Sequence, residues 1–238
     1  MDADALTALL GRDPFHVATH LLGVLFSLAA TYVLVRRARR NGMQGRGVGV
    51  YGLMMSVAFS ASVLFHFVED GSPRYDLYNK LDHSAIFLMI AGTGTAIYAA
   101  FQARWTDYLT GALWTVALMG ILLKLTLWPM PDWLTASIYV AVGWLGGIGV
   151  LALARRADAR PVSLFVVGAV VFSLGGVVYA VGWPSPWAQV VGPHGVFHVL
   201  VLAGAAFHVG FVYRHCTDPI IAGGTTRTQQ TRSAAASA

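Results

Sequence analysis

The sequence predicts an all-α integral membrane protein that folds as a bundle of seven transmembrane helices. Hydrophobic residues make up 56% of the 238 residues. Charged residues make up only 11%, less than half of the ~25% that is usual in a soluble domain. The apolar residues stand in continuous runs, each long enough to cross a bilayer as a helix. They do not alternate with polar residues, as they would in an outer-membrane β-barrel.

Seven apolar stretches follow one another along the chain, at 15–35, 48–68, 81–102, 108–128, 134–154, 162–182 and 194–213. Short segments rich in charge, proline or glycine separate them, in order RRARRNGMQGRG, EDGSPRYDLYNK, ARWTD, PMPD, RRADARP and WPSPWAQVVGP. Residues 1–14 then form a short N-terminal segment and residues 15–215 a single transmembrane domain. Residues 216–238 are predicted to be a disordered tail, because most of this segment is low in complexity.

Charge in the loops predicts the orientation of the bundle. The first, third and fifth loops are basic, with Arg36, Arg37, Arg39, Arg40 and Arg46, then Arg104, then Arg155, Arg156 and Arg160. Basic loops stay in the cytoplasm, so the N-terminus is predicted outside and the C-terminus inside a bacterial inner or plasma membrane. The formal charge of +5 is interpreted as topology and contact with lipid headgroups. No basic face typical of a nucleic-acid partner is apparent.

Ionisable residues at the ends of three stretches are predicted to meet on one side of the membrane. His66 ends the second stretch, Asp82 begins the third, and His194 and His198 begin the seventh. With antiparallel neighbours, these ends all face the same side. His194 and His198 are four residues apart, a spacing that places two imidazoles on one helix face and suits one metal ion. Ser62 lies one helical turn before His66.

Three imidazoles and a water suit Zn²⁺, which lowers the pKa of that water toward ~7 and polarises a carbonyl group. Asp82 can hold the water or accept its proton, and Ser62 can hydrogen-bond the water or a substrate oxygen. Each residue also has an ordinary alternative. The two histidines of the seventh stretch can serve helix packing, Asp82 can be a contact between helices, and Ser62 can bond a backbone carbonyl.

A second histidine pair of the same spacing, His16 and His20, begins the first stretch on the same side of the membrane. We interpret this pair as pore-lining or interfacial, although it competes with the first pair as a source of metal ligands. His83 follows Asp82 and points about 100° away on a helix, so it is left out of the site. Lys124, near the end of the fourth stretch, is expected to extend to the membrane interface.

Three motifs resemble the hemolysin III branch of the progestin and adipoQ receptor family, which includes the adiponectin receptors. They are SVLFH at 62–66, KLDHSAIFLMIAGT at 80–93 and HGVFHVLVLAGAAFH at 194–208, and the resemblance spans essentially all seven stretches. It implies that His66, His194 and His198 hold zinc, that Asp82 contacts zinc through water, and that Ser62 lies beyond the ligands. Adiponectin receptors have a cytoplasmic N-terminus, so the loop charges here predict the opposite orientation.

The resemblance implies a role in membrane lipid homeostasis, to which bacterial members of the family are linked. The wider superfamily includes alkaline ceramidases, and ceramidase activity is attributed to adiponectin receptors. The first hypothesis is therefore a zinc-dependent hydrolase of a ceramide-like lipid amide or ester, with Asp82 and Ser62 as catalytic residues. The second is a receptor-like sensor of membrane state with a structural zinc, and the third is a channel or transporter. An open zinc position favours the first, a closed coordination shell the second and a continuous polar path the third. The sequence leaves the substrate and the oligomeric state open.

Overall fold

The computed structural model describes residues 11–101, 104–150, 162–186 and 191–218. These residues form seven long helices, α2 (Pro14–Arg40), α3 (Arg46–Phe67), α4 (Tyr75–Phe101), α5 (Arg104–Thr126), α6 (Asp132–Gly146), α8 (Ser163–Val181) and α9 (Pro193–His215). All are long and apolar enough to cross a membrane when the span that contains α6 is counted through Val150. The predicted all-α, seven-helix fold is confirmed, and the chain is a multi-pass membrane protein.

The helices are longer than the apolar stretches at several ends, because hydropathy marks only the part that crosses the hydrocarbon. α4 begins at Tyr75 rather than at 81, and α2 continues to Arg40 rather than ending at 35. The basic residues in the last turn of α2 face the negative end of the helix dipole, which favours this extension. Pro14 and Pro193 stand in the first turns of α2 and α9, where the missing N–H costs nothing.

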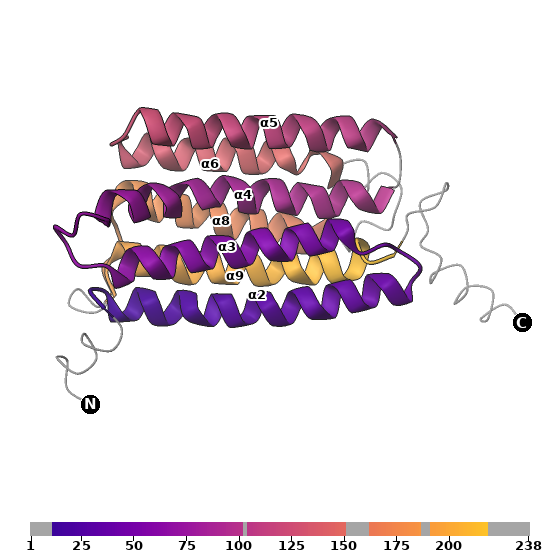
Figure 1. Cartoon of the computed structure of the whole chain (residues 1–238), viewed down its shortest axis with the longest axis horizontal. Coiled ribbons are helices and arrows are strands. Elements are labelled where there is room, and N and C mark those ends of the chain that lie inside the picture. Colours follow the sequence, from indigo (N-terminus) through magenta and orange to yellow (C-terminus); the bar gives the residue numbers. More distant parts are fainter. Residues whose placement is uncertain (1–10, 102–103, 151–161, 187–190, 219–238) are drawn as a thin grey trace, which may run out of the picture.

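The helices pack in an order that brings the first and the last described helix into contact. α2 packs on α3, α3 on α4, α4 on α5, α6 on α8 and α8 on α9, while α9 returns to contact α2. Consecutive helices run antiparallel along the long axis (Figure 1). As a result, the starts of α2, α4 and α9 and the end of α3 all lie at one end of the bundle, at the left in Figure 1.

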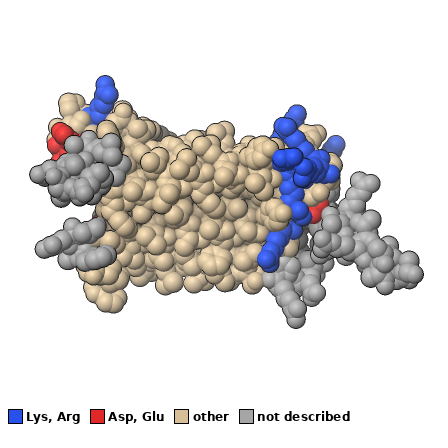
Figure 2. Space-filling model, turned by 90° about the horizontal axis from the view of Figure 1, so that it is seen from below, with Lys and Arg blue, Asp and Glu red and all other residues tan. Residues whose placement is uncertain are grey.

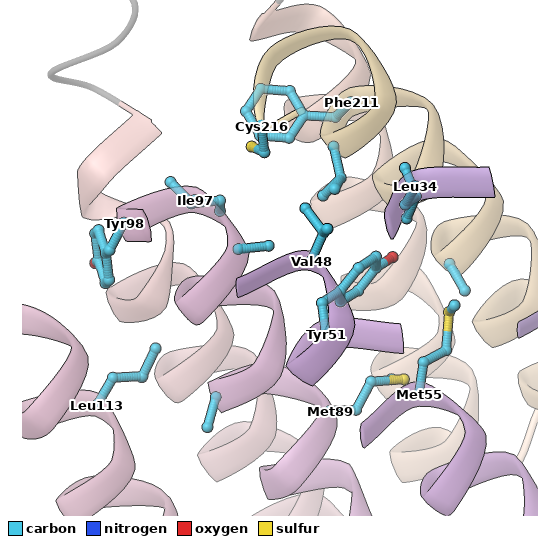
Figure 3. Close-up of a cluster of buried hydrophobic side chains, with 14 of the residues drawn as sticks. Leu34, Val48, Tyr51, Met55, Met89, Ile97, Tyr98, Leu113, Phe211 and Cys216 are labelled. Carbon is cyan, nitrogen blue, oxygen red and sulfur yellow. The ribbon is translucent and has the colours of Figure 1, made fainter. Parts of the chain in front are cut away.

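Large apolar side chains fill the centre and also cover the outer wall. Tyr51, Met55 and Phe211 belong to a continuous buried cluster (Figure 3), whereas Leu22 and Met119 are about two-thirds exposed at 60% and 65%. An exposed apolar wall of this kind is stable in lipid and would aggregate in water. The cluster therefore joins the helices, and the outer residues form the surface that faces the membrane.

Basic side chains gather at the end of the bundle opposite the starts of α2, α4 and α9 (Figure 2). In the described part of the chain they include the arginines at the end of α2 and the start of α3, whereas residues 155, 156 and 160 lie outside it. The first residues of the predicted tail, 216–218, are buried at this end. Arg37 and Asn41 donate hydrogen bonds to the side chain and carbonyl of Thr217. Residues 1–10 and 219–238 lie outside the described residues.

Candidate metal centre

Three histidines predicted as metal ligands lie together at the end of the bundle opposite the basic loop. His66 stands in the last turn of α3, and His194 and His198 stand in the first two turns of α9. One ring nitrogen of each lies within 4.8 Å of the others, and their ring centroids are 4.7–5.0 Å apart. Residues more than a hundred positions apart in sequence therefore form one group that can hold a metal ion.

The nitrogen atoms of this group have the properties expected of metal ligands. The Nε2 atoms of His66 and His194 and the Nδ1 atom of His198 are buried and have no hydrogen-bond partner within the described residues. Buried polar atoms of folded proteins nearly always have a partner. One divalent cation, held by one ring nitrogen of each of the three histidines, would provide such a partner, because neutral imidazole is a good metal ligand. The ring nitrogens of His16 and His20 are also buried without a hydrogen-bond partner among the described residues.

Local sequence explains why α9 can present its histidines here. Gly192 precedes the helix in an extended conformation and Pro193 begins it, so His194 stands in the first turn, at the site. Gly195 lies against the ring of Phe15, where a Cβ would be only 3.1 Å from the nearest ring carbon. A small residue at this position therefore lets the start of α9 approach the start of α2.

Asp82 and Ser62, predicted as catalytic residues, line the same cavity as His194. Ser62 is buried, with 2% of its surface exposed, and its hydroxyl is the polar neighbour of the Asp82 carboxyl group. Among the described residues, Asp82 does not belong to the group of close ligand atoms. A carboxylate beside the site, and not in it, is the arrangement expected of a group that acts on a bound water or substrate.

His16 and His20 lie closer to the three candidate ligands than a general pore-lining role requires. The centroid of the His16 ring is 4.7, 5.3 and 4.8 Å from those of His66, His194 and His198. The His20 ring stacks on His198 at 3.8 Å and lines the cavity. The site is thus a cluster of five imidazoles, and the sequence already contained the signal, since α2 begins on the same side.

Asp13 is the residue of the site that sequence reasoning missed. Its Oδ2 atom is 2.9 Å from Nδ1 of His66 and 2.8 Å from Nε of Arg12. Burial disfavours the charged carboxylate, but the hydrogen bonds from His66 and Arg12 outweigh this effect, so the pKa of Asp13 lies well below its usual range. The available signal was an acidic residue three positions before His16, at the point where the chain enters the membrane.

A cavity of about 140 Å³, lined by His20 and His194 of the imidazole cluster, runs into the bundle between α3, α4, α6, α8 and α9. On α4 its lining extends from Asp82 to Ile97, which is about 22 Å at 1.5 Å per residue. Most of the lining is apolar. Tyr179 adds a polar edge near the histidines, because its hydroxyl donates to Asp132 at 2.9 Å and lies 3.3 Å from Nε2 of His83.

Lys124 does not extend to the membrane interface as expected. Only 2% of its surface is exposed, and its Nζ atom donates to Oγ1 of Thr135 at 2.6 Å. The ammonium group also lies 5.3 Å from the ring centroid of Trp128 and 5.9 Å from that of Tyr139. The hydroxyl and the aromatic rings supply inside the protein the partners that a charged group needs when it leaves water.

Comparison with known proteins agrees with this architecture. Residues 10–209 match the family described as Haemolysin-III related. A hemolysin-3 of Bacillus cereus is 29% identical over 209 residues, which cover 84% of this chain and 90% of that protein. A hemolysin-3 homolog of Bacillus subtilis (strain 168) is 28% identical over 201 residues, which cover 83% and 91%.

A more distant similarity extends to eukaryotic receptors. An adiponectin receptor protein of Drosophila melanogaster is 26% identical over 235 residues, which cover 86% of this chain but 53% of that protein. The resemblance carried by the three sequence motifs is therefore confirmed. Since the family match covers nearly all of the described helices, the chain belongs to the haemolysin-III related family.

Proposed function

We propose that the chain is a zinc-dependent hydrolase that cleaves an amide or ester bond of a membrane lipid, with ceramide-like lipids as the substrate class. One observation carries the proposal: His194, whose Nε2 atom is buried without a hydrogen-bond partner among the described residues, lines a long apolar cavity that also contains a carboxylate. His66, His194 and His198 would hold the zinc ion. When bound, zinc polarises a carbonyl group and makes water acidic enough to react near neutral pH.

The chain's own residues supply the remaining requirements of hydrolysis. Asp82 accepts a proton from the attacking water and returns it to the leaving group, which is the task of a general base and acid. Ser62, beside Asp82, orients this carboxylate or donates its hydroxyl hydrogen to a substrate oxygen. Tyr179 and His83 present polar atoms at the same end of the cavity, where the headgroup of a lipid would lie.

The dimensions of the cavity support a lipid substrate. The hydrocarbon core of a bilayer is about 30 Å thick, so the chains of one leaflet span about 15 Å. The lining on α4, about 22 Å long, is therefore long enough for an acyl chain that enters from one leaflet. Ile97, Gly146 and Phe165 line the far part, and such apolar walls bind methylene groups and exclude water.

A receptor-like protein with a structural zinc is the second candidate. The closeness of the His16 ring to the three proposed ligands favours it. A fourth imidazole at this distance would close the coordination shell if its nitrogen joined the other three. Within the described residues, however, a nitrogen of His16 groups with Asp13 and His66, and not with the two histidines of α9. This placement of the His16 nitrogen supports an open fourth coordination position on the zinc ion, and hence the hydrolase. A channel is less well supported, because the far part of the cavity is mostly apolar.

Filling the cavity should separate acyl binding from metal binding. Gly143 lines the cavity, and a Cβ atom added there would meet no atom within 4 Å. We expect Gly143→Leu to lower turnover of long-chain lipids by about tenfold or more, a typical effect of occupying part of an apolar pocket. Short-chain lipids should be affected less, and the zinc content should not change. Turnover is measured on purified protein with lipids that differ only in acyl length.

Gly111 provides a matched control for this experiment. It also stands within a helix with open space around it, but it is exposed on α5 and does not line the cavity. Gly111→Leu should therefore leave turnover of both lipids unchanged. Equal losses of long-chain and short-chain turnover in Gly143→Leu would contradict the proposed acyl site.

The orientation of the bundle is tested separately. We propose that the arginine-rich end of the bundle (Figure 2) faces the cytoplasm. The end of α2 and the start of α3 carry Arg36, Arg37, Arg39, Arg40 and Arg46 there. A fluorescent reporter fused to the C-terminus should then fluoresce, and a periplasmic phosphatase fused there should be inactive. An active phosphatase would show that the orientation is inverted and that the metal centre opens to the cytoplasm.

A further inference from the structure

The segment that precedes α2 lies against the end of α3 that carries His66. The backbone N–H of Asp13 donates to the carbonyl oxygen of His66 at 3.2 Å. Gly11 has a φ of +78°, and a Cβ at this position would collide with the backbone of Phe67. This left-handed conformation favours glycine, and glycine also permits the close approach. The backbone of this segment therefore contacts the end of α3 directly.

The side chain of Asp13 adds a contact to the ring of His66 itself. Its Oδ2 atom is 2.9 Å from Nδ1, and the opposite ring nitrogen, Nε2, is the buried atom without a partner. A proton on Nδ1 that is donated to Asp13 leaves the Nε2 lone pair free for a metal. Histidine ligands of metals commonly donate their other N–H to a carboxylate, which fixes the tautomer and the ring orientation.

Arg12 holds Asp13 in place and is itself held by several contacts. Its Nε donates to Oδ2 of Asp13 and its Nη1 to Oδ1 of Asp70, both at 2.8 Å. The guanidinium carbon lies 4.9 Å from the ring centroid of Phe65 and 5.0 Å from that of Tyr75. These rings come from α3 and α4, so Arg12 joins the segment before α2 to both helices.

We propose that Asp13, held by Arg12, is the positioning residue for the metal ligand His66, so that the segment before the first helix is part of the metal centre. The inference rests on the proposed metal site. A geometric alternative exists, because Asp13, His16 and His66 can themselves form a group of metal ligands. The positive charge of Arg12 beside the Asp13 carboxylate disfavours a second cation there, which supports positioning over ligation.

The experiment measures metal affinity in the purified full-length chain, by competition of Zn²⁺ with a chelator. Asp13→Ala should weaken the affinity by about 10- to 100-fold, as is usual when a partner of a histidine ligand is lost. Asp13→Asn should weaken it less, because its amide oxygen still accepts a hydrogen bond but carries no charge. At saturating Zn²⁺ the number of ions per chain should remain that of the wild type in both variants.

Asp70→Asn is the matched control, because Asp70 contacts Arg12 but is 75% exposed at its side chain. This variant should bind Zn²⁺ like the wild type. The Co²⁺-loaded protein supplies a further readout, since the visible absorption of Co²⁺ depends on its ligands. We expect an altered spectrum at full occupancy in Asp13→Ala, partial recovery in Asp13→Asn and no change in Asp70→Asn.

The outcomes separate this inference from the proposed function. Wild-type affinity and an unchanged Co²⁺ spectrum in Asp13→Ala would overturn the positioning role while leaving the metal centre intact. If the wild type instead binds two ions and Asp13→Ala loses one of them, Asp13 is a direct ligand. This result would also overturn the positioning role. A wild-type chain that binds no metal would instead contradict the proposed metal site itself.

Discussion

Replacement of His194 by alanine should remove most of the zinc from the purified protein and abolish lipid turnover. The wild type should contain about one zinc ion for its three-histidine site. Loss of one of three protein ligands leaves two imidazoles, of which one belongs to a different helix. The imidazoles of His66 and His198 cannot compensate, because each already faces the same small space. Elemental analysis of the purified protein measures the zinc content.

A matched control is available on the same helix. His215 is also buried, but it stands in the last turn of α9, at the opposite end of the bundle. His215→Ala should retain the zinc of the wild type, even if both variants lose some packing energy. Comparison of the two variants therefore separates loss of a ligand from general destabilisation of the helix.

The two histidines of α2 decide whether the ligand assignment is correct. We expect His20→Ala to retain most of the zinc, because its ring stacks on His198 but does not belong to the group of ligand atoms. His16→Ala should also retain it if the fourth position is open. Full zinc content in His194→Ala, together with loss in His16→Ala, would move the site to α2.

Much of the fold could be predicted because the membrane imposes a simple rule. A segment that crosses the hydrocarbon must satisfy its backbone internally, so continuous apolar runs predict helices with little ambiguity. The number and order of the spans then determined which helix ends lie on the same side of the membrane. That argument, with the spacing of His194 and His198, was enough to predict a group that includes His66, and these residues do lie together.

Other features depended on contacts that no periodic pattern encodes. Asp13 lies outside the apolar stretches, and its carboxylate reaches His66 because the segment before α2 packs against the end of α3. Lys124 stands near the end of a span, where an extended side chain normally reaches water. Its burial requires the Thr135 hydroxyl from the following helix, and the geometry of that helix pair cannot be read from either segment alone.

Asp82→Asn should separate catalysis from metal binding. Asparagine keeps the shape of the side chain and one hydrogen-bond acceptor, but it cannot take a proton. Because Asp82 lines the cavity without belonging to the group of ligand atoms, the variant should keep most of its zinc. Lipid turnover should fall by about 10²-fold or more, the usual contribution of a general base. Turnover and zinc content are measured on the same preparation.

Asp76→Asn is the control for this change, since Asp76 is an exposed carboxylate in the first turn of the same helix. It should leave both zinc and turnover at the wild-type level. If zinc has only a structural role, Asp82→Asn should behave like this control in every assay of lipid turnover. The hydrolase proposal fails if the Asp82 variant keeps both its zinc and its full activity. Loss of zinc in the same variant would instead make the carboxylate a ligand, and catalysis would need another base near the cavity.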